Sequence, residues 1–300
     1  MSFTFFASCD KDENDDEKNI VATAQDTDNL STLVSALERA GLTSTLNGAG
    51  PFTVLAPNNT AFQKLLDSNS AWNSINDIDV NLLTDVLLFH VMNGEVKAAD
   101  LTTSYVNTLS KGPNDEAVSL RINTTDGVVF NGAAKPLTTD VETTNGIVHI
   151  IDEVMVPPGI VGIAATNDDF SILVSALTRS DLNTDYLSVL NGEGPFTVFA
   201  PTNGAFEALL AGNDEWNALA DIPVETLEAV LNYHVVSGAN VQSDELTNNQ
   251  VVATLGGNVT IDTSDGVAIK TSSDQTVKVA VADVQGVNGV VHAIGTVLLP

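Results

Sequence analysis

Residues 50–66 have the sequence GPFTVLAPNNTAFQKLL, and residues 194–210 repeat it as GPFTVFAPTNGAFEALL, with 12 of the 17 positions identical. The second copy follows the first at an offset of 194 − 50 = 144 residues. A period of this length far exceeds the roughly 20–50 residues of a solenoid unit. Each copy therefore marks one whole domain, and the chain contains the same domain twice.

Each copy predicts a buried strand that leads directly into a capped helix. The runs 52–56 and 196–200 are apolar on both alternating faces, which is typical of a strand covered on both sides. A proline ends each run because it cannot donate to a strand ladder. Asn58 and Thr202 follow as predicted N-caps, and apolar residues at helical spacing come after them.

The composition is strongly acidic. Eleven Lys and Arg stand against 39 Asp and Glu, which gives a net charge of −28 over 300 residues. Such a surface disfavours nucleic acid and anionic membranes, because few cations can replace phosphate counterions. Solubility explains the charge, and a cation-binding role is the alternative, although no defined site supports it. No apolar run approaches the roughly 18 residues of a membrane-spanning helix.

The N-terminal residues 1–18 predict a signal remnant and a tether. Phe6-Ala7-Ser8-Cys9 resembles the lipobox of bacterial lipoproteins, in which the cysteine is lipidated. The preceding apolar run is short and lacks a basic residue, unlike a complete export signal. The acidic run 10–18 is too polar to fold and is expected to be a tether. Lipidation of Cys9 is the favoured interpretation, and a free thiol on a tail is the alternative.

The remaining chain predicts two matched units, 19–157 and 158–300. Each begins with amphipathic helical stripes and ends in alternating strands, which indicates an α+β, mainly β domain. Asp126-Gly127 and Asp265-Gly266 predict hairpins with type I′ turns, and Asn145-Gly146 predicts a tight turn before the last strand. The linker Pro157-Pro158-Gly159 is short and stiff, so we expect a restricted orientation between the units.

Three motifs, present twice and in the same order, resemble those of the fasciclin (FAS1) domain family over nearly all of residues 19–300. They stand at 53–62, 89–90 and 145–157 in the first unit, and at 197–206, 233–234 and 288–300 in the second. The second copy departs from the pattern at Gly295, which replaces the acidic residue present as Asp152. The resemblance implies two antiparallel sheets in a wedge with a helical layer. It also implies a non-enzymatic extracellular adhesion module.

The four histidines are the main candidate functional side chains, and they form repeat-equivalent pairs: His90 with His234, and His149 with His292. Their apolar neighbours favour buried, neutral rings with hydrogen-bonded partners. Metal ligation and a recognition role are the alternatives. The family resemblance implies a binding role for the Tyr-His motif, which stands here as Tyr233 and His234 and, without the hydroxyl, as Phe89 and His90.

Together these features predict an adhesion protein at the cell surface, anchored in the outer membrane through Cys9 or secreted. It would bind a matrix protein, a cell-surface protein or a glycan, or make homophilic contacts. The alternative is a surface lipoprotein that binds a soluble glycan or small molecule for uptake. No nucleophile elbow or phosphate loop is present in the sequence, so we predict no enzyme, cofactor or metal.

Overall fold

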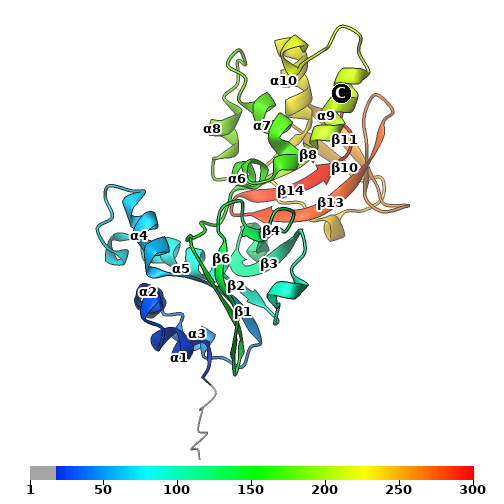
Figure 1. Ribbon diagram of the computed structural model, residues 1–300. Helices are drawn as coiled ribbons and strands as arrows, with labels where there is room; N and C mark the ends of the chain where they lie inside the picture. Colours follow the sequence, from blue (N-terminus) through cyan, green and yellow to red (C-terminus); the bar gives the residue numbers. More distant parts are fainter. Residues whose placement is uncertain (1–17) are drawn as a thin grey trace, which may run out of the picture.

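The computed structural model describes residues 18–300, which form two domains with the same order of elements (Figure 1). The first domain contains the helices α1 (Ile20–Gln25), α2 (Ser31–Arg39), α3 (Thr43–Leu46), α4 (Asn59–Asp67) and α5 (Val80–Phe89). Its strands are β1 (Phe52–Pro57), β2 (Val91–Asn93), β3 (Ser104–Lys111), β4 (Ala117–Asn123), β5 (Val129–Phe130), β6 (Pro136–Thr143) and β7 (Gly146–Ile151).

The second domain repeats this arrangement. Its helices are α6 (Ile160–Ala165), α7 (Ser171–Leu177), α8 (Tyr186–Leu190), α9 (Asn203–Ala211) and α10 (Val224–Tyr233). Its strands are β8 (Phe196–Pro201), β9 (Val235–Ser237), β10 (Val251–Thr254), β11 (Gly257–Asp262), β12 (Ala268–Lys270), β13 (Thr276–Gly286) and β14 (Gly289–Ile294). In both domains the helices gather on one side of the strands (Figure 1).

Each domain has seven strands, in the order β5-β4-β3-β2-β1-β7-β6 in the first and β10-β11-β12-β13-β14-β8-β9 in the second. The pairs β1–β7 and β8–β14 are parallel, and the other pairs are antiparallel. The prediction of two tandem α+β domains, each with a helical layer, is confirmed. The parallel pairs correct the expectation from the family resemblance, which implied two antiparallel sheets.

Strand β1 separates the two apolar clusters of its domain, which explains its unbroken apolar sequence. Val54 and Ala56 face a cluster that includes Phe62 of α4 and lies between the helices and the sheet. Leu55 faces the opposite way, into a cluster that includes Phe89. Because side chains alternate along a strand, both faces of β1 must be apolar. The predicted strand, buried on both sides, is confirmed.

The two predicted helix caps differ in the structure. Asn58 accepts a hydrogen bond from the Ala61 N–H at 2.8 Å and caps α4 as predicted. Thr202 is the N-cap residue of α9, as predicted, but its hydroxyl makes no capping hydrogen bond. Instead, the Ala205 N–H donates to the Thr202 carbonyl oxygen at 3.0 Å. A backbone bond thus replaces the expected hydroxyl.

The predicted turns occur near their expected places, with different geometry. Strands β4 and β5 pair at Ile122 and Phe130, so the hairpin is confirmed. Its loop spans 124–128, however, and only Gly127 of the Asp-Gly pair has a positive φ, of 94°, so the turn is not type I′. The tight turn between β6 and β7 consists of residues 144–145, one position earlier than the Asn-Gly pair.

The domains meet where β4 lies beside β13 (Figure 1). The Gln285 N–H of β13 donates to the Ser119 Oγ of β4 at 3.0 Å. The linker also packs on the second domain, because the Pro158 carbonyl oxygen accepts from the Val287 N–H at 2.9 Å. These contacts restrict the relative orientation of the domains, as the short, stiff linker predicted.

Candidate functional site

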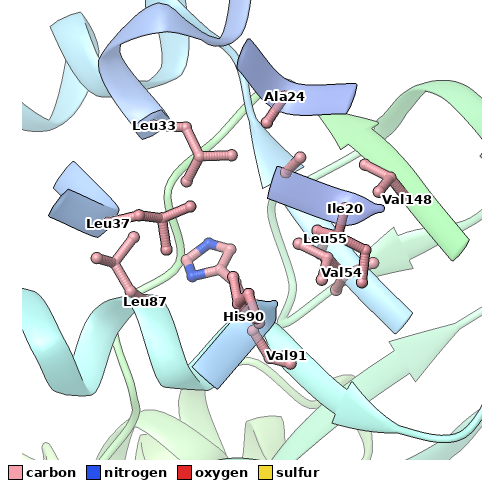
Figure 2. A pocket seen from close by; sticks show the side chains of 12 residues that line it. Ile20, Ala24, Leu33, Leu37, Val54, Leu55, Leu87, His90, Val91 and Val148 are labelled. Carbon is pink, nitrogen blue, oxygen red and sulfur yellow. The ribbon is translucent and has the colours of Figure 1, made fainter. Parts of the chain in front are cut away.

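His90 ends α5 and is held by two hydrogen bonds to backbone groups. Its Nδ1 lies 2.7 Å from the Val86 carbonyl oxygen, and the Met155 N–H donates to its Nε2 at 3.0 Å. Because Nε2 accepts, Nδ1 must carry the proton. Figure 2 shows the ring among apolar side chains such as Leu33 and Leu37. The ring thus joins the end of α5 to the C-terminal segment of its domain.

The cavity beside His90 is too small for a ligand. Its volume is about 10 Å³, and its lining is almost entirely apolar (Figure 2). This volume matches about one water molecule. The ring is only 2% exposed, and burial lowers its pKa from 6.5 to about 4, so the ring is neutral at pH 7. His90 therefore acts as a structural staple between two segments.

His234 repeats this arrangement in the second domain. Its Nδ1 lies 2.7 Å from the Val230 carbonyl oxygen, and the Leu298 N–H donates to its Nε2 at 3.0 Å. Burial lowers its pKa from 6.5 to about 4 as well. The prediction of buried, neutral and hydrogen-bonded rings is confirmed for both motif histidines. The two ring nitrogens are already occupied, which leaves no free nitrogen for a metal or a substrate.

His149 and His292 also join separate segments through both ring nitrogens, but they adopt the opposite tautomer. The Asp140 N–H donates to Nδ1 of His149 at 3.2 Å, so Nε2 carries the proton and donates to the Val96 carbonyl oxygen at 2.9 Å. His292 makes the same bonds at 3.2 and 2.9 Å, to Asp283 and Val241. Each ring thereby joins the last strand of its domain to an irregular strand and to a loop.

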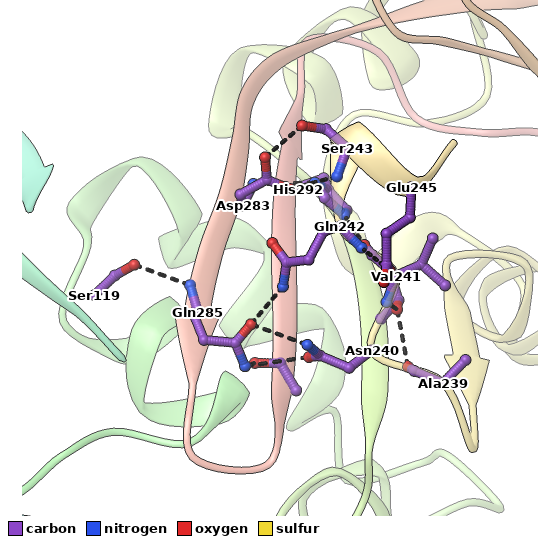
Figure 3. Close-up of polar contacts among 12 residues, drawn as sticks. Ser119, Ala239, Asn240, Val241, Gln242, Ser243, Glu245, Asp283, Gln285 and His292 are labelled. Atoms are coloured by element: carbon purple, nitrogen blue, oxygen red, sulfur yellow. Dashed lines mark hydrogen bonds and ion pairs between the residues drawn. The ribbon is translucent and has the colours of Figure 1, made fainter. Parts of the chain in front are cut away.

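The strand opposite each of these rings is bulged at an aspartate. Asp140 and Asp283 have φ values of 58° and 60°, and each lies within an interval where the pairing register shifts, between Thr138 and Val141 or between Val281 and Val284. In the second domain the Asp283 carboxylate accepts from the Ser243 N–H at 2.8 Å and from the Ser243 hydroxyl (Figure 3). Burial lowers the pKa of His292, which keeps this ring neutral beside the carboxylate. The bulge is therefore held by paired polar groups.

A network of neutral amides lies next to this bulge, at the boundary with the first domain (Figure 3). The Gln285 side chain accepts from Gln242 at 2.6 Å and from Asn240 at 3.1 Å. Its own amide donates to the Gly289 carbonyl oxygen at 3.0 Å. All three side chains are buried, and all three are hydrogen-bonded. A satisfied network of this kind specifies one arrangement of the segments that it joins.

Asn145 and Asn288 are structurally important residues whose role the sequence analysis missed. The Asn145 side chain accepts from the Ile20 N–H at 2.9 Å and donates to the carbonyl oxygens of Leu46 and Gly48 at 2.8 Å. Asn288 makes the equivalent three bonds in the second domain. The Asn-Gly pattern indicated only a turn. Its recurrence in both repeats was the one available signal for this second role.

The residues that the family resemblance implied for binding lie inside the domains. Phe89 and Tyr233 are 0% and 1% exposed, and they belong to equivalent apolar clusters. The Tyr233 hydroxyl donates to the Asn258 carbonyl oxygen at 2.8 Å and accepts from the Ser272 N–H at 3.1 Å. The structure thus brings each ring next to its histidine without presenting either to solvent. Their role in binding stays a prediction.

Two further features concern metals and membranes. Within residues 18–300, no group of three or more His, Cys, Asp or Glu side chains is placed to hold a metal ion. None of the helices in that range is long and apolar enough to cross a membrane. Cys9, the predicted lipidation site, lies outside the described residues.

The fold and the repeated histidine contacts define a protein built from two tandem copies of one α+β domain. A sequence profile of the fasciclin domain matches residues 28–157 and 168–300, so the chain belongs to the fasciclin domain family. A solved FAS1 domain pair from the insect cell adhesion molecule fasciclin I is similar in fold. It has a TM-score of 0.53 and 19% identity, and the match covers 91% of this chain and 97% of that one.

Several relatives share this family. Protein sll1483 of Synechocystis is 40% identical over 141 residues, which are 47% of this chain and 73% of that protein. Human periostin is 32% identical over 258 residues, which are 85% of this chain. The pig transforming growth factor-beta-induced protein ig-h3 is 30% identical over 261 residues, also 85% of this chain. This chain covers only 29% of periostin and 35% of the pig protein.

Proposed function

We propose that this protein is a non-enzymatic adhesion protein that presents two docked fasciclin domains outside the cell. The observation that carries the proposal is the match of the fasciclin domain to both halves of the chain. The domain pair with the similar fold comes from a protein described as a cell adhesion molecule. The motif histidines support a non-enzymatic role, since both nitrogens of each ring are used by the fold.

We further propose that Cys9 is lipidated and that the acidic residues after it hold the domains away from the membrane. The partner would be a matrix protein, a glycan or another cell surface. Binding of a soluble glycan or small molecule for uptake is the second candidate. It would need a concave pocket lined by exposed aromatic side chains.

An attachment assay tests the adhesive function. A strain that lacks the gene is compared with its parent and with a strain that carries a Cys9→Ser variant. Loss of attachment in the deletion strain supports adhesion, and an equal loss with Cys9→Ser supports the lipid anchor. Equal attachment and aggregation by the deletion strain and its parent would refute the adhesive function.

The buried Tyr-His segments enter the proposal as predicted contributors to binding. A Tyr233→Phe variant removes the hydroxyl that the first domain already lacks at Phe89. Stability falls in either case, because the hydroxyl makes two hydrogen bonds inside the domain. If the segment contacts a partner, the variant also binds more weakly per folded molecule. If the segment is purely structural, binding per folded molecule stays the same.

A further inference from the structure

A polar groove of about 560 Å³ lies between the two domains. One wall is the outer face of β3 and β4. The other wall consists of the 3₁₀ turn that follows α6 and the bulge of β13. The side chains that matter for its chemistry are Tyr105, Asn107, Arg121, Asn167, Asp169 and Asp283. Its volume falls within the range of about 300–1,000 Å³ that is usual for small-molecule sites, and such sites favour domain boundaries.

The strand register explains why the first wall is polar. Tyr105 lies opposite Arg121, and Asn107 lies opposite Ser119, so these four side chains share one face of the β3–β4 pair. The residues between them, such as Leu120, point into the apolar core of the domain. The polar face is thus the outer face, and it is turned toward the second domain.

Hydrogen bonds between the domains hold the two walls in place. Arg121 donates through one guanidinium nitrogen to the Thr166 carbonyl oxygen at 2.9 Å. The Asn167 amide donates to the Tyr105 hydroxyl at 3.0 Å, which leaves the hydroxyl proton free to donate. Together with the bond between Ser119 and Gln285, these contacts hold the groove open at a fixed width before any ligand enters. Such preorganisation favours binding.

Arg121 is the most informative residue of the groove. Its side chain lines the groove, although the residue is only 8% exposed. It takes part in none of the ion pairs of residues 18–300. A buried cation without an ion pair is costly unless oxygen atoms accept its remaining N–H groups. The guanidinium bonds to the Thr166 carbonyl oxygen and also interacts with the Tyr105 hydroxyl. A ligand that supplies oxygen acceptors would add to these contacts.

We propose that this groove binds a neutral saccharide. Arg121 and Asn107 can donate to hydroxyl and ring oxygens, whereas Asp169 and Asp283 can accept from hydroxyl groups. An anionic ligand is disfavoured by these two carboxylates and by the net charge of −28. A cationic ligand could pair with the two carboxylates but could not accept from the Arg121 guanidinium. A hydroxyl-rich neutral molecule satisfies both kinds of group at once.

This inference deepens the proposed adhesive function, since it names a site and a ligand class. To test it, an array of neutral and uronate-containing oligosaccharides is probed with the purified full-length chain. Each hit is then titrated by isothermal calorimetry against the parent and two variants, Asn107→Ala and Asp169→Ala. Asp168→Ala is the matched control, because Asp168 is an exposed neighbour of Asp169 that does not line the groove.

The expected result is a set of neutral hits whose affinity falls about tenfold or more in each groove variant and stays unchanged in Asp168→Ala. Both groove substitutions remove exposed side chains, so the melting temperature should not change. An array without neutral hits, hits confined to uronates, or equal affinity in the groove variants would overturn the proposal. Attachment assays with the same variants distinguish failure of the groove proposal from failure of the adhesive function. Normal attachment together with an array without hits would refute the saccharide-binding role of the groove but not the adhesive function.

Discussion

Acidification is expected to destabilise both domains through His90 and His234. Burial lowers the pKa of each ring from 6.5 to about 4 in the folded chain. Between these two values the unfolded state binds more protons, so the free energy of unfolding falls as the pH decreases. The linkage relation gives a loss of about 2 kcal/mol per domain between about pH 7.5 and about pH 5. Below about pH 4 the loss levels off near 3 kcal/mol.

The structure explains why the charged ring is disfavoured. Nε2 of His90 accepts from the Met155 N–H, so a proton added there would face another donor at 3.0 Å. The ring is surrounded by apolar side chains, and the cavity beside it matches at most one water molecule, too little to solvate a charge (Figure 2). Protonation therefore breaks one staple and buries an uncompensated charge.

Urea unfolding at the two pH values measures this loss. The single tryptophan of each domain, Trp72 or Trp216, reports on its own domain by fluorescence. Acid also protonates carboxylates in a chain with net charge −28, so the parent is compared with the variants His90→Gln and His234→Gln. Glutamine does not titrate, and its side-chain oxygen can still accept from the Met155 or Leu298 N–H. The parent should lose about 2 kcal/mol more per domain than the matching variant.

Proton NMR gives an independent check, because the chain has only four histidines. The ring protons of His90 and His234 should titrate well below the ordinary midpoint of 6.5, near 4. Titration of either ring near 6.5 would refute the reasoning. So would an equal loss of stability in the parent and in the glutamine variants.

Three further predictions test the staples and the boundary between the domains. His149→Ala and His292→Ala should each destabilise their own domain by about 1–3 kcal/mol in urea unfolding, because two hydrogen bonds are lost; no change would contradict the staple role. Asn145→Ala should cost the first domain about 2–4 kcal/mol in urea unfolding, since three backbone groups, two of them in buried bonds, lose their partner. Gly112→Ala would place a Cβ 2.4 Å from the Gly286 carbonyl oxygen, so small-angle scattering should show the domains separating while each stays folded; Gly204→Ala, with nothing within 4 Å, is the control.

Much of the fold could be predicted from the sequence, because its signals are local. Because the motifs occur twice, they predicted two domains. The apolar run 52–56 predicted a strand covered on both faces. Burial of the motif histidines also followed from their apolar neighbours. These features depend on residue types within a few positions of each other, which periodicity and turn chemistry describe well.

The partners of the buried polar groups could not be predicted in the same way. His90 meets Met155, which lies 65 positions away, and Asn145 meets Leu46, which lies 99 positions away. Only the folded topology brings such segments together. The groove between the domains is the extreme case, since its walls come from both repeats and appear only when β4 docks beside β13.

Divergence between the repeats marks the docking surface. The positions of the buried amide network in the second domain carry charged residues in the first. Glu95, Lys97 and Glu142 stand where the second domain has Asn240, Gln242 and Gln285. In the first domain the side chains of Lys97 and Glu142 form an exposed ion pair, with 52% and 72% of their surface accessible.

Burial explains the exchange of charges for amides. Gln285 is only 2% exposed, and a Cβ added to Gly112 of the first domain would lie 2.9 Å from its side-chain nitrogen. A charged pair in this place would lose its hydration when the first domain covers it, which costs several kcal/mol per ion. Neutral amides instead satisfy one another at the same positions. The second domain is therefore adapted to be covered by the first, which holds the groove between them at a fixed width.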